Sequence, residues 1–316
     1  MKRTLIYTGS AFLLGLLLAT AYWRARPLNR TRLPLAPAPL APVLTGGGTS
    51  GTVVYSSIVQ TDPYQTRIFL KNLGTGEVRQ LTTSVYNDSP TWSPDGSQIM
   101  YDSWTKENRS DIYLMNKDGT NQRPVLATTA NEYMAAWSPD GNRIVFISDT
   151  DGPPNQIYIM DLKTQQTTRL TNIPEGAYSP AWSPDGKSIA FASPAKYRGS
   201  EIFVMNADGS NVQQMRDYNV DNFDDKPIWC PDGSCIIFER ENANQQFMVL
   251  DLRDRAVVPL LIGVFDTMRQ EVDLGRTPVR EYVTFCVDQK FYAMDTKSRK
   301  IYVLPVMDAL RLSLYP

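Results

Sequence analysis

The chain has 316 residues, a formal net charge of −1 and no histidine. Because no basic block occurs beyond the N-terminal segment, nucleic acid is not expected as a partner. The absence of histidine removes the commonest general base and the commonest metal ligand. Function classes that rest on histidine chemistry are therefore excluded at the outset.

The first 26 residues are apolar for most of their length. Residues 4–23, TLIYTGSAFLLGLLLATAYW, carry no charge, and twenty such residues can cross a hydrocarbon core as a helix. Tyr22 and Trp23 fit an interfacial belt. Residues 1–26 therefore predict a transmembrane signal anchor, with membrane contact through 4–23. A cleaved signal peptide is the alternative, since residues 19–21 fit a small-x-small cleavage site. Basic residues flank both sides, so charge alone does not set the orientation.

Residues 27–51 predict a linker. Five prolines favour an extended polyproline conformation, and the segment TGGGTSG adds a flexible end. Such a segment would hold the remaining domain, residues 52–316, away from a membrane.

A tryptophan followed by a Pro-Asp-Gly turn recurs four times. The copies begin at Trp92, Trp137, Trp182 and Trp229, which are 45, 45 and 47 residues apart. A fixed period in this range is typical of repeat architectures. Short apolar runs such as RIVFIS (143–148) and QIYIMD (156–161) follow each turn and read as strands. They are apolar on both pleat faces, so both faces should be covered. Four strands per unit, repeated, predict the blades of a β-propeller.

Two incomplete units flank the four clear copies. Residues 53–59, 67–74 and 78–82 match the last three strands of a unit, and a degenerate unit spans 271–306. A first unit without its innermost strand would leave an unpaired edge. We therefore predict an all-β, six-bladed β-propeller over residues 52–316. The C-terminal strand, 308–316, is expected to close the ring by completing the first blade.

The repeat itself resembles a known family. Trp-Ser-Pro-Asp-Gly, then Ile-x-Phe, then Ile-Tyr-x-Met-x-x-Asp-Gly is similar to the WD-like repeats of TolB-type propellers, over about residues 52–316. The resemblance implies the fold more than the function, since this scaffold hosts many roles. TolB is periplasmic, and its N-terminal α/β domain binds partners of the cell envelope. No match to that domain precedes the repeats here, so the resemblance does not carry TolB's own partners to this chain.

Two of the three cysteines, Cys230 and Cys235, bracket the turn WCPDGSC. The two positions should lie opposite each other on adjacent strands, about 4.5–5.5 Å apart at Cβ, near the range a disulfide needs. We expect a disulfide; two independent small residues are the alternative. A disulfide would place the propeller in an oxidising compartment and favour an anchor whose N-terminus is cytoplasmic. The propeller would then be periplasmic or extracellular, or secreted after cleavage. Cys286 is expected to be a core thiol.

No catalytic constellation is evident in the sequence. It has no Gly-x-Ser-x-Gly elbow, and SDTDG (148–152) lacks the ligand ladder of a calcium loop. The recurring turn aspartates, Asp95, Asp140, Asp185 and Asp232, are turn formers. We therefore expect no enzyme activity, no catalytic residue, no cofactor and no metal site.

The candidate binding residues lie on one face of the predicted disc. Its loops, 103–110, 148–155, 193–200 and 239–245, are long and dissimilar, and such loops on rigid scaffolds often bind ligands. Four residues before each repeat tryptophan, at the mouth of the predicted channel, stand Asp88, Tyr133, Tyr178 and Asp225. Glu132 and Asp224 should add negative potential there, and Trp104 and Tyr197 lie on the outer loops. The alternative is a solvated acidic rim without a ligand.

The sequence thus predicts a non-catalytic, membrane-anchored, extracytoplasmic propeller. It would act as a protein-binding scaffold or as a subunit of a membrane or envelope complex. The alternative is a sensor of a small molecule, a glycan or a cation, or a lyase-like enzyme. Either would use the acidic channel mouth, where carboxylates and tyrosines could hold a polar ligand.

Overall fold

The structure is a computed structural model, and the part of the chain that it describes is all-β. It describes residues 51–61, 64–84, 86–104, 109–126, 128–195, 199–215, 222–230, 232–241 and 246–259, and strands at 273–275, 282–287, 290–295, 301–304 and 309–315. The predicted anchor, the predicted linker up to residue 50, and Tyr197 lie outside these ranges. Within them, no helix has the length and apolar character needed to cross a membrane.

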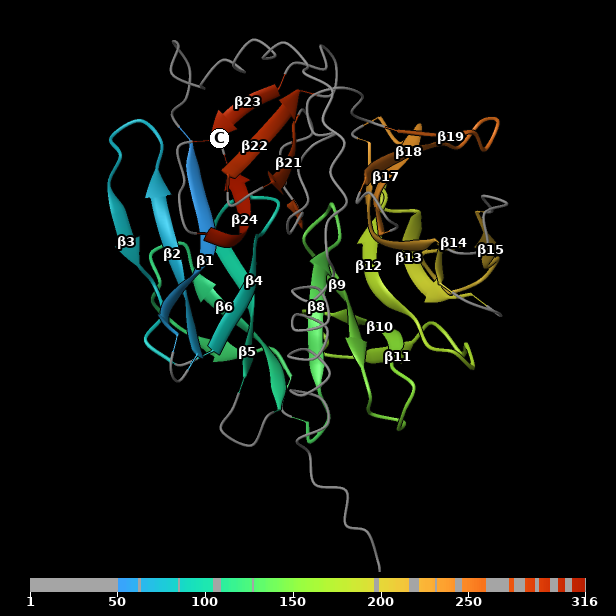
Figure 1. Cartoon of the computed structure of the whole chain (residues 1–316). Coiled ribbons are helices and arrows are strands. Elements are labelled where there is room, and N and C mark those ends of the chain that lie inside the picture. The colour runs from blue at the N-terminus through green and yellow to red at the C-terminus, as the bar shows by residue number, and fades with distance from the viewer. Residues whose placement is uncertain are drawn as a thin grey trace, which may run out of the picture. The chain divides into compact units, whose positions relative to one another are not determined.

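The described strands form four hydrogen-bonded sheets, and in each of the two larger sheets one parallel pair, Thr66↔Tyr86 or Ser200↔Phe223, joins two antiparallel groups of four strands. We divide the sheets at these pairs into antiparallel arrays of four strands, numbered here in chain order (Figure 1). Array 1 comprises β24 (Ala309–Tyr315), β1 (Thr52–Thr61), β2 (Tyr64–Asn72) and β3 (Val78–Gln80). Array 2 comprises β4 (Tyr86–Trp92), β5 (Gln98–Trp104), β6 (Ser110–Asn116) and β7 (Arg123–Pro124). Array 3 comprises β8 (Glu132–Trp137), β9 (Arg143–Ser148), β10 (Gln156–Asp161) and β11 (Thr167–Arg169).

The second half of the chain repeats the pattern. Array 4 comprises β12 (Tyr178–Trp182), β13 (Ser188–Pro194), β14 (Ser200–Asn206) and β15 (Gln213–Gln214). Array 5 comprises β16 (Phe223–Trp229), β17 (Cys235–Glu241), β18 (Gln246–Asp251) and β19 (Val257–Pro259). Array 6 comprises β20 (Asp273–Gly275), β21 (Tyr282–Val287), β22 (Lys290–Asp295) and β23 (Ile301–Leu304). We call the strands of an array first to fourth in this order.

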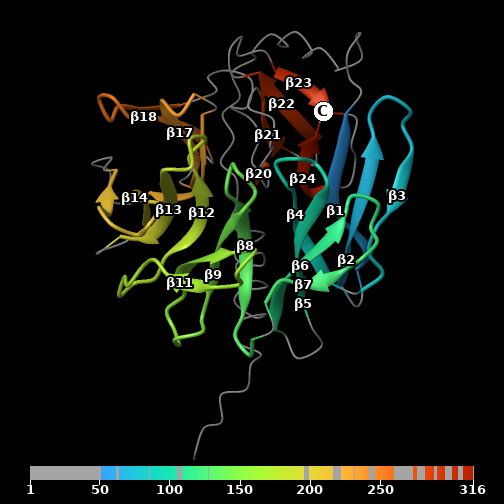
Figure 2. The ribbon, with the colours of Figure 1, turned by 180° about the vertical axis from the view of Figure 1, so that it is seen from behind.

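Array 1 is assembled from both ends of the described chain. β24 pairs with β1 in antiparallel register, from Thr52↔Tyr315 to Ser57↔Ala309, and lies beside it in both views (Figures 1 and 2). β24 also contacts β20 of array 6 and β4 of array 2. The last strand of the chain therefore supplies the first strand of the first array.

The core lies between successive arrays. In β9, Ile144 and Phe146 pack in a cluster with array 2, while Val145 packs in a cluster with array 4. Because successive side chains of a strand point to opposite faces, a strand covered on both faces needs an unbroken apolar run. Each fully buried Ile or Phe stabilises the fold by about 1.5–3 kcal/mol relative to exposure.

The repeat tryptophans belong to these inter-array cores. Trp92 is buried in a cluster that joins arrays 1 and 2, and Trp182 in one that joins arrays 3 and 4. Trp137 and Trp229 are partly buried against the cores of arrays 2 and 3 and of arrays 4 and 5. The tryptophan of each repeat thus holds its array to its neighbour.

The turn after each tryptophan has its own hydrogen-bond pattern. Ser93 Oγ donates to Asp95 at 2.6 Å and accepts from the Gln98 backbone N–H at 2.9 Å. Arrays 3 and 4 repeat both bonds. Array 5 has Cys230 and Cys235 at the serine and glutamine positions, and they form a disulfide with a Cα–Cα distance of 5.2 Å. The predicted disulfide is confirmed, and it joins the two positions that a serine hydroxyl links elsewhere.

Candidate functional site

Four of the predicted binding residues occupy equivalent positions on first strands. Asp88 is in β4, Tyr133 in β8, Tyr178 in β12 and Asp225 in β16, and all four are half-buried. First strands contact one another in the pairs β24–β4, β8–β12, β12–β16 and β20–β24. The long loops between second and third strands start beside the same ends, as the pair Tyr86↔Trp104 shows. We call this end of the arrays the loop end.

A backbone irregularity follows each of these four residues. The next residues, Ser89, Met134, Ser179 and Lys226, have φ between 49° and 54°, and the pairing register shifts at the same point. A non-glycine residue in the left-handed region is disfavoured by its Cβ, so the surrounding structure must hold it there. Bulges of this kind re-aim side chains and end strand pairing. The bulge is a shared property of the repeat that positions the four candidates.

Carboxylates near the loop end connect neighbouring arrays. Asp88 of array 2 accepts a hydrogen bond from Ser56 Oγ of array 1 at 2.6 Å. Asp102 of array 2 accepts from the backbone N–H of Met134 in array 3 at 3.1 Å. These two carboxylates therefore hold adjacent arrays in register.

The two tyrosines are neutral hydrogen-bonding groups. The Tyr133 hydroxyl accepts from Asn155 Nδ2 at 2.5 Å, which ties it to the loop 149–155. Burial raises the pKa of Tyr133, and burial also raises the pKa of Tyr178 to about 12. Both phenols keep their protons near neutral pH, so they can donate as well as accept hydrogen bonds.

Two of the acidic candidates lie inside the protein. Asp224 is buried and forms a bidentate ion pair with Arg240, with N–O distances of 2.7 and 2.8 Å. The guanidinium compensates its charge, so Asp224 adds little negative potential to an exposed rim. Glu132 is only 1% exposed. The negative charge expected at the channel mouth is therefore carried by Asp88 and Asp225 more than by the full set of four carboxylates.

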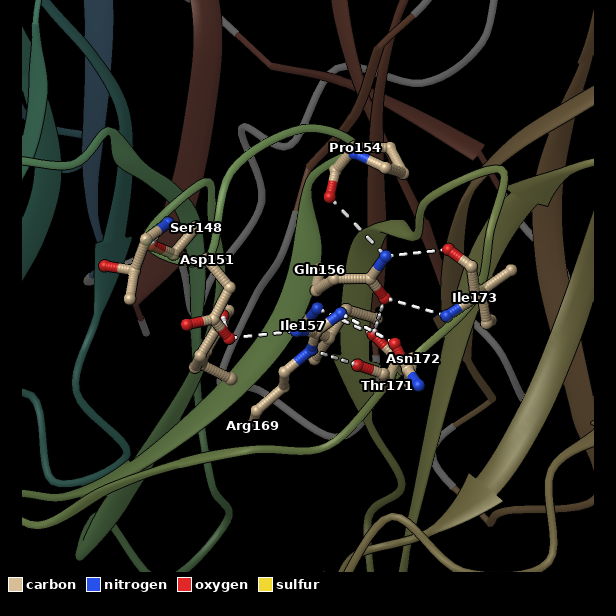
Figure 3. Close-up of polar contacts among 11 residues, drawn as sticks. Ser148, Asp151, Pro154, Gln156, Ile157, Arg169, Thr171, Asn172 and Ile173 are labelled. Carbon is tan, nitrogen blue, oxygen red and sulfur yellow. Dashed lines mark hydrogen bonds and ion pairs between the residues drawn. The ribbon is translucent and has the colours of Figure 1, made fainter.

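A buried amide that the sequence analysis missed fixes the loop end of array 3 (Figure 3). Gln156 Oε1 accepts from Thr171 Oγ1 at 2.8 Å and from the Ile173 N–H at 3.1 Å. Asp151 accepts from Tyr158 and from Arg169, and these bonds hold the pKa of its carboxyl below the ordinary value. The only signal for Gln156 in the sequence is a polar residue at the head of an apolar strand.

The described residues also expose apolar side chains at the loop end. Ile58 and Val59 are each 39% exposed at the end of β1, and Trp104 is 38% exposed at the end of β5. Backbone pairs set Ile58 and Trp104 in one row with Tyr86, because Ile58 lies opposite Thr66, Thr66 opposite Tyr86, and Tyr86 opposite Trp104; Val59 follows Ile58 in β1. We call Ile58, Val59, Tyr86 and Trp104 the apolar row. Of these residues, only Trp104 was predicted.

The described residues contain no group of three or more His, Cys, Asp and Glu side chains arranged to hold a metal ion. Asp149, in the segment that faintly resembled a calcium loop, accepts instead from the N–H and the side-chain amide of Asn131, at 2.8 and 2.6 Å.

Comparison with known proteins identifies the fold. The TolB structure from Acinetobacter baumannii aligns with a TM-score of 0.68 at 21% identity, covering 85% of this chain and 68% of that one. A chain of a nidogen/laminin complex aligns at 0.63 with 9% identity, covering 84% and 98%. An oligogalacturonate lyase in complex with manganese aligns at 0.55 with 15% identity, covering 81% and 78%. No curated protein matches the sequence. The family model described as TolB beta propeller domain matches residues 48–261. The chain therefore belongs to the TolB β-propeller domain family.

Proposed function

We propose that this chain is a non-catalytic, membrane-anchored, extracytoplasmic propeller that binds a protein partner through its loop end. Each of the six arrays is then one blade, and the pairing of β24 with β1 closes the ring. The protein would serve as a scaffold or a subunit of an envelope complex.

The apolar row is the observation that carries this proposal. Its four residues come from arrays 1 and 2, so the row crosses a boundary between two blades, where a partner would contact both. Aromatic residues such as Tyr and Trp are enriched in the buried centres of protein interfaces and often dominate their binding energy. The polar groups around it, including Asp88, would form the rim of such an interface.

The proposed location rests on the disulfide and on residues 4–23. Disulfides persist in oxidising compartments and are rare in the cytosol of most organisms. An uncharged stretch of twenty residues before the propeller suits a membrane anchor. The aligned nidogen/laminin structure is a complex between proteins, which is compatible with a partner-binding role for the same fold.

The alternative uses the first strands instead of the apolar row. Asp88, Tyr133, Tyr178 and Asp225 would hold a small molecule, a glycan or a cation, and the aligned oligogalacturonate lyase shares the fold. The two proposals differ in which residues matter, and this difference can be tested directly.

The test is capture of the native complex from membranes in several mild detergents. We compare the wild type with Trp104→Ala and with the matched control Val78→Ala, which removes an exposed apolar side chain at the start of the edge strand β3. We expect Val78→Ala to retain the partner and Trp104→Ala to weaken binding more than tenfold, in line with a central interface aromatic. Recovery of free monomer alone in every detergent, or equal capture by both variants, would contradict the proposal. Loss of binding only in Asp88→Asn with Asp225→Asn would favour the alternative.

A further inference from the structure

A hydroxyl at the head of a third strand bonds across two of the inter-array boundaries. Between arrays 1 and 2, Thr66 Oγ1 accepts from the backbone N–H of Asn87 at 3.2 Å. Between arrays 4 and 5, Ser200 Oγ donates to the backbone oxygen of Asp224 at 2.8 Å. In both cases the partner is the buried residue five positions before the repeat tryptophan. These bonds satisfy polar groups that the boundary removes from water.

The boundary between arrays 2 and 3 has the same two positions but lacks this bond. Ser110 is fully buried at the head of β6, and Glu132 is 1% exposed at the head of β8. Glu132 Oε1 accepts from Thr128 Oγ1, whereas Glu132 Oε2 and Ser110 Oγ have no hydrogen-bond partner among the described residues. The Ser110 N–H donates to the side chain of Asn131, the residue next to Glu132, so the two positions adjoin.

The surroundings of Glu132 are rich in negative charge. Burial is the largest cause that raises the pKa of the Glu132 carboxyl, and the charges of Asp111 and Asp149 raise it further. Arg109 lowers the pKa of the Glu132 carboxyl and lies 3.8 Å from Asp111. Asp149 is held by Asn131. The Glu132 carboxyl is therefore buried among more acidic than basic influences, and a buried charge without compensation is costly.

We propose that the boundary between arrays 2 and 3 is a cation site, in which Glu132 Oε2 and Ser110 Oγ bind one hard cation. Carboxylate and hydroxyl oxygens suit Ca²⁺ or Na⁺, whereas Zn²⁺ prefers nitrogen and sulfur. With no preassembled group of three carboxylates among the described residues, backbone and water oxygens complete the shell. We therefore expect an affinity in the weak range of extracellular calcium modules, about 10⁻⁴–10⁻³ M. The site braces two arrays and does not depend on the proposed protein partner.

The test uses thermal unfolding of the full-length chain in detergent, after chelation and exchange into choline chloride. CaCl₂, NaCl, KCl and MgCl₂ are then added separately. At a concentration well above Kd, a ligand that binds only the folded state raises Tm. For the wild type we expect Ca²⁺ or Na⁺ to raise Tm by a few degrees. Glu132→Gln and Ser110→Ala should lose this response. The control Glu175→Gln, which neutralises an exposed carboxylate before β12, should keep it.

Two results would overturn the site. No rise of the wild-type Tm with any of the four cations would mean that the two oxygens are served by buried water alone. An equal rise in wild type and Glu132→Gln would place the cation elsewhere. Glutamine has nearly the shape of glutamate and can still accept from Thr128, so this variant remains informative even where Ser110→Ala unfolds.

Discussion

The disulfide of array 5 occupies positions that other arrays join by a hydroxyl, and this makes it replaceable. In array 4 these positions are Ser183 and Ser188; Ser183 Oγ accepts from the Ser188 N–H at 2.9 Å and donates to Asp185 at 2.6 Å. The double variant Cys230→Ser with Cys235→Ser therefore recreates the pair found in array 4. We expect it to fold with the same turn.

The size of the effect follows from two opposing contributions. The disulfide closes a loop of about six residues, for which the chain-entropy model gives about 2 kcal/mol of stabilisation. The serine hydroxyl would restore two hydrogen bonds, each worth about 0.5–1.5 kcal/mol. The net loss should be about 1 kcal/mol or less, which lowers the Tm of a domain of this size by about 2–4 °C.

Differential scanning calorimetry of the oxidised wild type, the Ser/Ser variant and an Ala/Ala variant separates the two contributions. Alanine cannot make either hydrogen bond, so Ala/Ala should melt below Ser/Ser, and Ser/Ser slightly below wild type. Equal melting of Ser/Ser and Ala/Ala would refute the argument that the hydroxyl links the turn. Free thiols at Cys230 and Cys235 in protein taken from its native membrane would argue against the proposed extracytoplasmic location.

Three further predictions concern the seam, the buried carboxyl and the loop end. Deleting residues 308–316 removes the strand that pairs with six consecutive residues of β1, so cooperative unfolding should be lost; a calorimetric transition like that of the full chain would contradict ring closure. The folded-state pKa of Glu132 lies above its ordinary value of 4.5. The protonated carboxyl therefore contributes its full stabilisation below about pH 4.5, and this stabilisation is lost as the pH rises through the folded-state pKa. In cation-free buffer, Glu132→Gln should therefore gain Tm relative to wild type with rising pH, and parallel pH–Tm curves would exclude this origin. The double variant Asp88→Asn with Asp225→Asn should fold, because an amide oxygen can still accept from Ser56 and from the Lys226 N–H. The loss of affinity for any ligand bound there should be greatest at low salt, where surface charge is least screened.

Much of the fold could be predicted because the same strand-and-turn pattern occurs four times in the sequence. The Pro-Asp-Gly turns and the unbroken apolar runs act through local chemistry, so the predicted strands coincide with the observed ones, as RIVFIS does with β9. The disulfide was predictable for the same reason, since turn geometry sets Cys230 opposite Cys235. Residue types that recur at the same position of each repeat thus predict the local backbone conformation, either turn or strand.

The candidate site was harder to predict because its properties depend on pairs of residues from different arrays. The sequence around Asp224 does not indicate that it pairs with Arg240, sixteen residues later. This ion pair compensates the negative charge that Asp224 was expected to add to the rim. Ile58 and Val59 sit within an apolar strand and are exposed only because β1 continues past the covered part of its array, with a register shift between Ile58 and Gln60. The exposure of Ile58 and Val59 and the pairing of Asp224 with Arg240 depend on tertiary structure, so they could not be predicted from the order of residues alone.

The position five residues before each repeat tryptophan shows where new chemistry can enter such a fold. It holds Asn87, Glu132, Ala177 and Asp224, which are all buried. The side chains there differ in polarity: the Asn87 amide donates to the backbone of Ser84, Ala177 has only a methyl group, and the Asp224 carboxylate is paired with Arg240. The backbone therefore fixes burial at this position but not polarity. Burial makes any polar group there expensive unless it finds a partner. The Asn87 amide is hydrogen-bonded to Ser84, the Asp224 carboxylate is paired with Arg240, and Ala177 has no polar side-chain group. Within the described part of the chain, Glu132 keeps one oxygen without a partner, so array 3 is where this buried position leaves room for a bound ligand.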